Sequence, residues 1–298
     1  MKKVVSVSLG SSKRDKRVQI DFKGVPVVVE RIGTNGNIQK AQQLFSELDG
    51  NVDCLSVGGV DLALRLDGRA YPLYAARKLV KDVKQTPVVD GQGLKGTLER
   101  RVIELARPAL GGVPHYKSAF MAMGVDRVGM ARAICEVTDE VVFGDLMVGL
   151  GVPLIIKGFK NFRRVLKVML PLVSLFPMSM IYYDSMTGEV EPKYENYWKE
   201  AELIAGDFLF MSKVLPHDLS GKTIITNTTT AENVQFLKDK GISTIITTTP
   251  RYDGRSFGTN MMEAVFTAYA GKGRILADEE LNALIDDVDM RPDVIRFD

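Results

Sequence analysis

Two glycine-rich segments follow predicted strands and are the first candidates for chemistry. The earlier one, Gly91-Gln92-Gly93-Leu94-Lys95-Gly96, precedes a predicted helix over residues 97–106, which is the setting of a phosphate-binding turn. Glycines there let the backbone approach an anion closely, and the helix N-terminus favours negative charge. The acid expected about 20 residues later is missing. We expect Gly91 and Gly93 to contact a substrate, with an ordinary glycine-rich turn as the alternative.

The second turn is Gly124-Val125-Asp126-Arg127-Val128-Gly129, also placed between a predicted strand and a predicted helix. Gly124 and Gly129 take the first and third glycine positions of a dinucleotide fingerprint, and Asp126 takes the middle one. Asp145 follows about 20 residues after Gly124, the spacing of an acid that binds a ribose. A carboxylate at the middle position adds bulk and repels phosphate. We predict that Gly124, Gly129 and Asp145 bind NAD or NADP.

Hydroxyl-rich residues follow two later strands of the same kind. Asn227, Thr228 and Thr229 come after the run 223–226. Three threonines at positions 247–249 stand at the end of the run 244–247. Such groups can hold a ribose, an amide or a phosphate, so we place Asn227, Thr228 and Thr229 at the cofactor. The alternative is that Thr229 or Thr230 caps the helix that begins near residue 231.

A further segment combines two arginines with the start of an amphipathic helix near residue 260. Arginine beside a helix N-terminus can hold a carboxylate or a phosphate. We assign to substrate binding Arg251, Asp253, Arg255 and Ser256. A solvated loop with a capping residue is the alternative.

Composition limits the function classes. The chain has 298 residues and a net charge of +2, which does not fit a protein that grips nucleic acid. Two histidines and two cysteines are too few and too far apart for a metal site or a disulfide framework. The longest apolar stretch, 165–183, is interrupted by Lys167, Pro171 and Pro177, so we expect no membrane span and a cytoplasmic location. Motifs of serine hydrolases and zinc enzymes are missing.

The elements that must position these residues alternate between strand and helix. Apolar runs near residues 4–9, 52–57, 119–123, 140–143, 223–226 and 244–247 predict strands, and helical spacing appears at 38–48, 97–106, 128–137, 197–204, 231–240, 260–270 and 278–285. We therefore predict an α/β fold with mostly parallel sheets, Rossmann-like βαβ units and two domains. The Pro- and Gly-rich residues 107–116 place the boundary between 1–112, a substrate domain, and 113–298, a nucleotide domain.

Four segments together resemble the bacterial proteins named quinate 5-dehydrogenase, namely VVSVSLGSSKRD, VVDGQGLKGTLERR, GVDRVGMARA with EVVFGDLM, and DGRSFGTNMMEA. The resemblance covers most of the chain. It implies an oxidoreductase that oxidises a cyclic hydroxy acid such as quinate or shikimate with a nicotinamide cofactor. From their position after a strand, Lys95 and Asp90 would be the catalytic pair, because a lysine with a lowered pKa can transfer the proton.

The alternative function is a non-redox Rossmann-like protein that binds a phosphorylated or anionic metabolite, since a fold does not fix a function. Asp126 favours this alternative, whereas Asp145 favours the dehydrogenase. Both functions imply a small anionic molecule as the partner. The sequence leaves open a homo-oligomer.

Overall fold

The computed structural model describes residues 1–149, 151–181, 195–252 and 255–297, and they form two compact units. Unit 1 comprises the described residues within 1–94, 168–185 and 259–288, and unit 2 comprises those within 95–167, 186–258 and 289–298. The chain first changes unit at Leu94/Lys95, earlier than the boundary that the sequence predicts at residue 112. Each unit is assembled from three separate stretches of chain.

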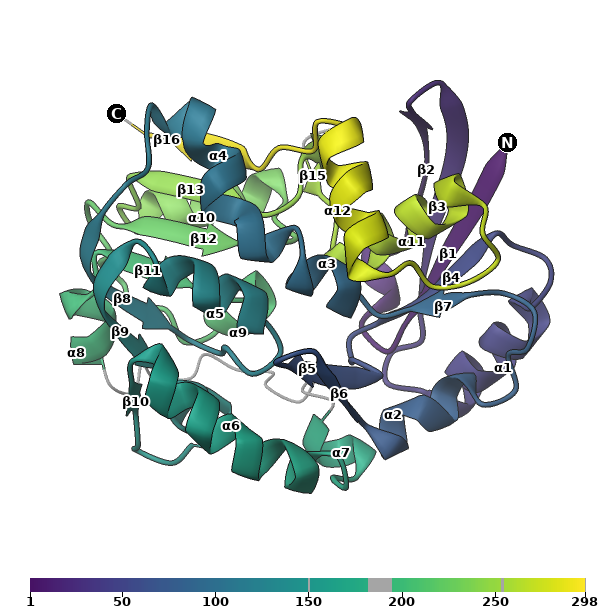
Figure 1. The fold of residues 1–298 in the computed structure, drawn as a ribbon, viewed down its shortest axis with the longest axis horizontal. Helices are drawn as coiled ribbons and strands as arrows, with labels where there is room; N and C mark the ends of the chain where they lie inside the picture. The colour runs from purple at the N-terminus through teal and green to yellow at the C-terminus, as the bar shows by residue number, and fades with distance from the viewer. Residues whose placement is uncertain (150, 182–194, 253–254, 298) are drawn as a thin grey trace. The chain divides into compact units, whose positions relative to one another are not determined.

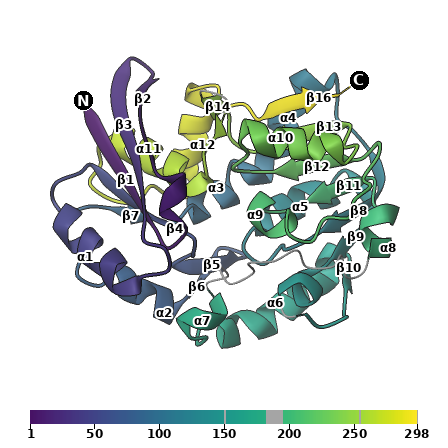
Figure 2. The same cartoon turned by 180° about the vertical axis from the view of Figure 1, so that it is seen from behind.

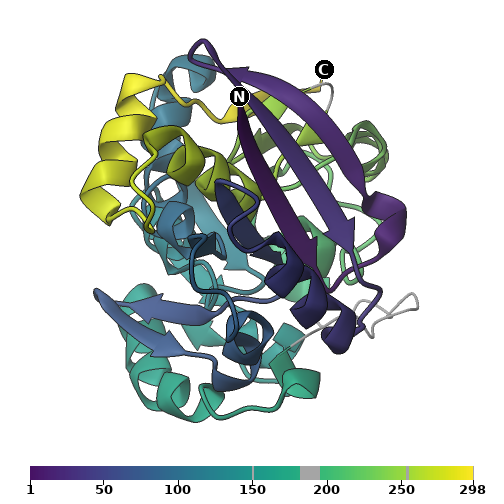
Figure 3. The ribbon, with the colours of Figure 1, turned by 90° about the vertical axis from the view of Figure 1, so that its right-hand side faces the viewer.

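Unit 1 is built on a five-stranded sheet with the order β2-β3-β1-β4-β7. Its strands are β1 (Lys2–Ser8), β2 (Lys16–Phe22), β3 (Val25–Gly33), β4 (Cys54–Gly58) and β7 (Val88–Val89). The strands are parallel except for the edge hairpin of β2 and β3, which is visible in purple in Figure 3. Lys23 and Gly24 turn this hairpin with positive φ angles, as a tight turn between twisted strands requires.

Helices pack on both faces of the unit 1 sheet. Val5, Val7 and Leu55 point to the face that packs on Phe45 of α1 (Ile38–Leu48). The opposite face meets α11 (Thr259–Ala270), although this helix comes more than 200 residues later. The remaining elements are η1 (Ser12–Arg14), β5 (Ala63–Leu66), β6 (Arg69–Pro72), α2 (Tyr74–Arg77), η2 (Lys78–Val80), α7 (Met178–Ile181) and α12 (Asp278–Asp287).

Unit 2 is built on a seven-stranded sheet with the order β10-β9-β8-β11-β12-β13-β16. Its central strands run parallel, namely β8 (Tyr116–Met121), β9 (Thr138–Phe143), β11 (Leu203–Ala205), β12 (Thr223–Thr226) and β13 (Thr244–Thr247). The two edge strands, β10 (Ile156–Lys157) and β16 (Asp293–Arg296), are antiparallel to their neighbours. Five parallel strands lie between these two edge strands, and their carboxyl ends all lie at the same rim of the sheet.

Helices cover both faces of the unit 2 sheet as well. Figure 1 shows α4 (Val102–Leu110) and α5 (Val128–Cys135) in front of it, and Figure 2 shows α9 (Phe208–Met211) and α10 (Ala231–Asp239) on the opposite face. The core includes Phe120 and Trp198. The unit also contains η3 (Glu99–Arg101), η4 (Asp145–Gly149), α8 (Glu195–Glu200), β14 (Arg251–Tyr252) and β15 (Arg255–Ser256). Two helices, α3 (Gln92–Gly96) and α6 (Phe159–Val173), cross the division between the units.

The predicted fold class is confirmed, because parallel strands joined by helices make up both main sheets. One predicted element is wrong. Residues 197–204 were expected to form a single helix, but the helix ends at Glu200 and β11 begins at Leu203. Within the described ranges, no helix combines the length and the apolar character needed to cross a membrane.

Candidate functional site

Charged and polar side chains gather at the carboxyl ends of the parallel strands of unit 2. Asp207 and Asn227 come just after β11 and β12, and Thr248 directly follows β13. Asp126 and Arg127 lie on the connection from β8 to α5. Ligands of open α/β sheets bind at this rim, because the connections diverge there and leave backbone groups accessible. The position of these residues therefore qualifies them as a candidate site.

Arg127 is the centre of this cluster. Its guanidinium donates to the carboxylate of Glu99 and, over 2.6 Å, to Oδ2 of Asp207, and its Nε lies 3.4 Å from Oδ2 of Asp126. The planar guanidinium presents five N–H donors, which is why one arginine can serve three carboxylates. The arginine is almost completely buried, so these carboxylates replace the water that it has lost.

Further polar groups complete the cluster. The ammonium group of Lys95 lies 3.4 Å from Oδ2 of Asp126. The side-chain amide of Asn227 donates to Oδ2 of Asp207 over 3.0 Å. The hydroxyl of Thr248 lies 3.4 Å from Oε1 of Glu99, at the far side of Arg127. The cluster, which we call the rim cluster, consists of Lys95, Glu99, Asp126, Arg127, Asp207, Asn227 and Thr248.

Burial and charge act in opposite directions on the acids of the rim cluster. Burial raises the pKa of Glu99 above the usual range of a glutamate, although Arg127 and Lys95 oppose this shift. Burial also acts to raise the pKa of Asp207, but Arg127 and the hydrogen bond from Asn227 outweigh it and hold that pKa below its usual range. Asp207 is therefore a carboxylate at neutral pH.

Accessibility divides the rim cluster into an inner and an outer part. Lys95, Glu99 and Arg127 are buried, whereas the side chains of Asp126 and Asp207 are 16% and 14% exposed. The distances from Asp126 to its two cations, 3.4 Å each, exceed the usual 2.7–2.9 Å of a charge-assisted hydrogen bond. Asp126 is thus partly exposed and lies at long distance from these two cations.

The turn at residues 124–129 is closed by the protein's own carboxylate. Oδ1 of Asp145 accepts hydrogen bonds from the backbone N–H groups of Gly124 and Val125, over 2.9 and 2.7 Å. These are N–H groups that a pyrophosphate would need. A Cβ at Gly129 would lie 2.0 Å from the carbonyl oxygen of Lys95, so this glycine serves internal packing. The residues at this turn do not fit a pyrophosphate, which corrects the roles expected for Gly124, Gly129 and Asp145.

The threonines of the other strand ends also serve internal contacts. The hydroxyl of Ser256 accepts from the backbone N–H of Thr229 over 2.7 Å, and Thr230 caps α10, as the alternative to ligand binding predicted. Thr228 is half-buried and has a positive φ of 50°. Asn227 alone of the three predicted cofactor contacts has a side-chain contact to the rim cluster. Whether NAD or NADP binds elsewhere stays a prediction.

The predicted arginine clamp is only partly described. Nε of Arg251 lies 3.8 Å from Oδ2 of Asp293 in the same unit. The backbone of Arg255 belongs to β15, which pairs with β14, and Asp253 lies outside the described residues. Arg251 and Ser256 are paired across β14 and β15, and their role at a substrate stays a prediction.

Gly91 and Gly93 of the first glycine turn belong to unit 1 and are packed against helices. A Cβ at Gly91 would lie 2.8 Å from the backbone nitrogen of Asn260, and one at Gly93 would lie 2.6 Å from Leu281. The carboxylate of Asp90 accepts from the backbone N–H groups of Leu62, Ala63 and Gln92. Asp90 thus fixes local backbone, whereas Lys95, its predicted catalytic partner, contacts Asp126 in unit 2.

Of the rim cluster, the sequence singled out Lys95 and Asn227 as site residues, and it did not predict a site role for Glu99, Asp126, Arg127, Asp207 or Thr248. Asp207 was missed because the three-residue strand before it was taken for part of a helix. The apolar run Leu203–Ala205 followed by Gly206 was the available signal, since a short apolar run that ends at glycine is typical of a buried strand. Glu99 gave no signal, because a glutamate in a helical segment is usually exposed.

Comparisons with known proteins give a family and a set of similar folds. Residues 93–297 match the model of a domain of unknown function, DUF8754, and residues 3–90 match another, DUF8753. No curated protein matches the chain. Among solved structures, GanP, a glucose-galactose binding protein from Geobacillus stearothermophilus, is 13% identical, with a TM-score of 0.37 over 99% of this chain and 97% of its own.

Two further solved structures are described as carbohydrate-binding proteins. A galactofuranose binding protein is 11% identical, with a TM-score of 0.36 over 99% of this chain and 95% of its own. A carbohydrate transporter solute binding protein from Agrobacterium radiobacter is 10% identical, with a TM-score of 0.31 over 92% and 90%. TM-scores this low carry no argument about what this chain binds.

The resemblance to quinate 5-dehydrogenase is wrong. The family models that match residues 93–297 and 3–90 describe domains without a known function, and neither describes a quinate dehydrogenase. The oxidoreductase assignment rested on that resemblance and on the turn at residues 124–129. Because Asp145 occupies the N–H groups of this turn, neither observation supports the assignment. The match over residues 93–297 covers more than half of the chain, and the protein therefore belongs to the DUF8754 family of domains of unknown function.

Proposed function

We propose that this protein is a non-redox binding protein whose rim cluster holds a small, neutral, polyhydroxylated molecule of the monosaccharide class. The observation that carries the proposal is the chemistry of the accessible part of the cluster. Two carboxylates, Asp126 and Asp207, are partly exposed, the buried ammonium group of Lys95 lies 3.4 Å from Asp126, and the buried Arg127 contacts both carboxylates. This set offers both acceptors and a donor within one small area.

A polyol matches this set because each of its hydroxyl groups can donate to a carboxylate and accept from an ammonium group. Hydrogen bonds to charged partners are the stronger ones, each contributing about 1.5–3 kcal/mol. The buried arginine holds the pKa of Asp207 low and contacts Asp126 as well, so a ligand would meet acceptors that are already oriented.

An anionic metabolite, which the sequence favoured, matches the accessible groups less well. Asp126 and Asp207 would repel a negatively charged ligand, and Lys95 is buried and lies 3.4 Å from Asp126. Arg127 is committed to three carboxylates and is buried, so it does not present its charge to a ligand. The proposed ligand is therefore neutral.

Thermal melting with paired sugars tests the proposal. D-galactose, D-glucose and D-arabinose would each be added at about 10 mM, and D-galacturonate would serve as the charged counterpart of galactose. A ligand at 100 times its Kd stabilises the folded protein by about 2.7 kcal/mol, which raises the Tm measurably. We expect at least one neutral sugar to raise the Tm and galacturonate to raise it less.

The variant Asp126→Asn locates the site. Because an amide is a weaker acceptor than a carboxylate, we expect the affinity for the active sugar to fall about 10- to 150-fold, the equivalent of 1.5–3 kcal/mol. The matched control is Asp139→Asn, which alters an exposed carboxylate at the start of β9 that is near His115. Stabilisation by galacturonate alone would reject the neutral ligand. Equal affinity in Asp126→Asn and the control would reject the rim cluster as the site.

A further inference from the structure

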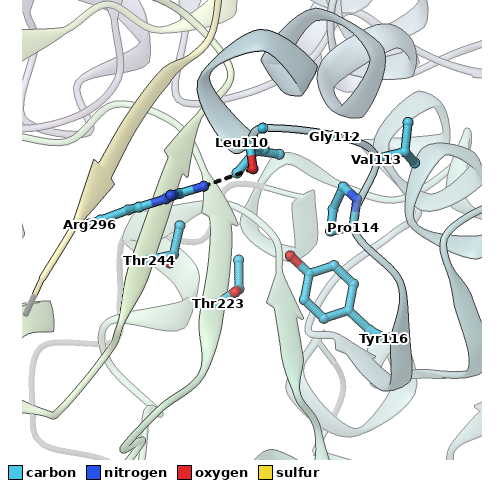
Figure 4. Close-up of a pocket in the computed structure, with 9 residues that line it drawn as sticks. Leu110, Gly112, Val113, Pro114, Tyr116, Thr223, Thr244 and Arg296 are labelled. Carbon is cyan, nitrogen blue, oxygen red and sulfur yellow. Dashed lines mark hydrogen bonds between the residues drawn. The ribbon is translucent and has the colours of Figure 1, made fainter.

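A pocket of about 340 Å³ opens at the opposite rim of the unit 2 sheet, where the parallel strands begin. The strands β8, β12 and β13 start here, and the connection between α4 and β8 passes over them (Figure 4). Its volume lies in the range of small-molecule sites, about 300–1,000 Å³. The lining residues are Leu110, Gly111, Gly112, Val113, Pro114, Tyr116, Thr223, Thr244 and Arg296.

Arg296 is anchored over this pocket by the end of a helix. Its Nη2 donates to the carbonyl oxygen of Leu110 over 2.9 Å, and Figure 4 shows the side chain reaching across from β16. Leu110 is the last residue of α4, so its carbonyl has no partner within the helix. A guanidinium has five N–H donors, and this contact uses one of them. Arg296 is thus oriented and keeps donors for a ligand.

Three hydroxyl groups surround the same space. Tyr116, Thr223 and Thr244 stand at the first positions of their strands, and in Figure 4 the Tyr116 hydroxyl points toward Thr223. Burial raises the pKa of Tyr116, so its hydroxyl remains protonated and can donate. None of the nine lining residues carries a carboxylate. The pocket therefore combines one fixed positive charge with neutral hydrogen-bonding groups.

The other walls of the pocket are apolar or open. Leu110, Val113 and Pro114 contribute aliphatic surface. Gly111 and Gly112 contribute backbone, and a Cβ at either would meet no atom within 4 Å, so free space adjoins them. Gly111 caps α4 in the left-handed conformation, with φ of 73°, which turns the chain across the strand starts. A small organic group would find apolar contact beside Arg296.

We propose that this pocket is a second ligand site, which binds a small organic anion through a single carboxylate or phosphate group on Arg296. The guanidinium would pair with the oxyanion, the hydroxyls would bind its remaining lone pairs, and the aliphatic walls would contact its organic part. The site is separate from the rim cluster, because the two lie at opposite ends of the same parallel strands. The two sites also differ in charge, because the pocket exposes the cation Arg296 whereas the rim cluster exposes the carboxylates of Asp126 and Asp207.

Calorimetric titration of the full chain with benzoate and with inorganic phosphate tests this proposal, and benzamide serves as the neutral counterpart of benzoate. We expect one or both anions to bind, with benzamide at least tenfold weaker than benzoate if the carboxylate is recognised. Binding of benzoate alone identifies a carboxylate ligand, and binding of phosphate alone identifies a phosphate ligand. The absence of binding by both anions would overturn the proposal.

Substitutions at Arg296 locate the binding. We expect Arg296→Ala to weaken the bound anion at least tenfold and Arg296→Lys to weaken it less, because lysine keeps the charge but loses the planar fork. The matched control is Arg291→Ala, an exposed arginine of the same unit that contacts Asp289. Circular dichroism and Tm of each variant report folding. Unchanged affinity in a folded Arg296→Ala variant would overturn the assignment.

Discussion

A single carboxylate, Asp145, determines what the turn at residues 124–129 can do. The spacing from Gly124 to Asp145 is that of a ribose-binding acid, but the side chain points back to the turn and accepts from Gly124 and Val125. The carboxyl group is buried, and its Oδ2 has no hydrogen-bond partner in the described structure. Burial, opposed by the two backbone hydrogen bonds, raises its pKa to about 7. The spacing along the chain could not reveal that the Asp145 side chain points back to the turn.

The raised pKa of Asp145 predicts a pH dependence of stability. The folded carboxyl group binds its proton more tightly than the unfolded one, whose pKa is near 3.8. Its stabilisation is therefore complete below that value and is lost as the pH rises to about 7, at about 1.4 kcal/mol per pH unit in between. We expect Asp145→Asn to remove this part of the slope in urea unfolding between pH 4.5 and 8. Parallel slopes in wild type and variant would contradict the buried-acid account.

A second buried acid with a raised pKa, Glu263 in unit 1, predicts a similar pH dependence of stability. It lies buried on α11 and accepts from the backbone N–H of Leu94 over 3.1 Å. Burial and the nearby Asp90 raise its pKa to about 8. Its stabilisation is thus lost up to pH 8, and Glu263→Gln, which imitates the protonated acid, should be less sensitive to pH between 5 and 8 in Tm measurements. Glu279→Gln, at an exposed position of α12, is the control and should follow wild type.

At the scale of elements, the sequence predicts long, periodic segments well and short buried ones poorly. Helical spacing located α1, α10, α11 and α12. The strand β11 was missed because three apolar residues carry no period. Because β11 was missed, Asp207, which comes just after it, was not recognised as a residue of the candidate site.

The close approach of α5 to the end of α3 depends on Gly129. A Cβ at this position would lie 2.0 Å from the carbonyl oxygen of Lys95, which is backbone and cannot rotate away. We expect Gly129→Ala to reduce the free energy of unfolding by about 1–3 kcal/mol or more, as overpacking does. The matched control is Gly149→Ala, whose Cβ would meet only the terminal methyl of Met123 at 3.3 Å. A variant as stable as this control would contradict the described contact.

The first turn of α10 is closed by a capping box. The hydroxyl of Thr230 accepts from the backbone N–H of Asn233, and the Asn233 side chain accepts from the backbone N–H of Thr230. Removing this cap with Thr230→Ala should cost about 1 kcal/mol in chemical unfolding, and Thr230→Ser should restore most of it. If alanine and serine behave alike, the hydroxyl does not cap the helix.

At the scale of the whole molecule, the sequence predicted the fold class but not how the chain divides. Composition marks the Pro- and Gly-rich residues 107–116, yet the chain first changes unit at Leu94/Lys95 and changes again later. The helix α11 belongs to unit 1 because it packs on β1 and β4, where Asn260 donates to the hydroxyls of Ser6 and Ser56. Contacts between residues more than 200 positions apart leave no local signal.

The rim cluster is likewise formed by residues that are far apart in the sequence. Arg127, Asp207 and Thr248 follow three different strands and meet because these parallel strands end at one rim, where Lys95 joins them from α3. The sequence could indicate which strand ends are polar, and it singled out Lys95 and Asn227. It could not show that Arg127 turns inward to hold three carboxylates, since that depends on packing across the sheet.

The most direct test of the proposed function is a two-dimensional amide NMR titration of the intact protein with D-galactose, or with another neutral sugar if that one raises the Tm most. The account predicts saturable shift changes centred on Lys95, Asp126, Arg127, Asp207 and Asn227, with little change around Arg296. Changes that saturate at other residues, or no saturable change with any neutral sugar, would contradict the claim that the rim cluster binds a polyhydroxylated ligand.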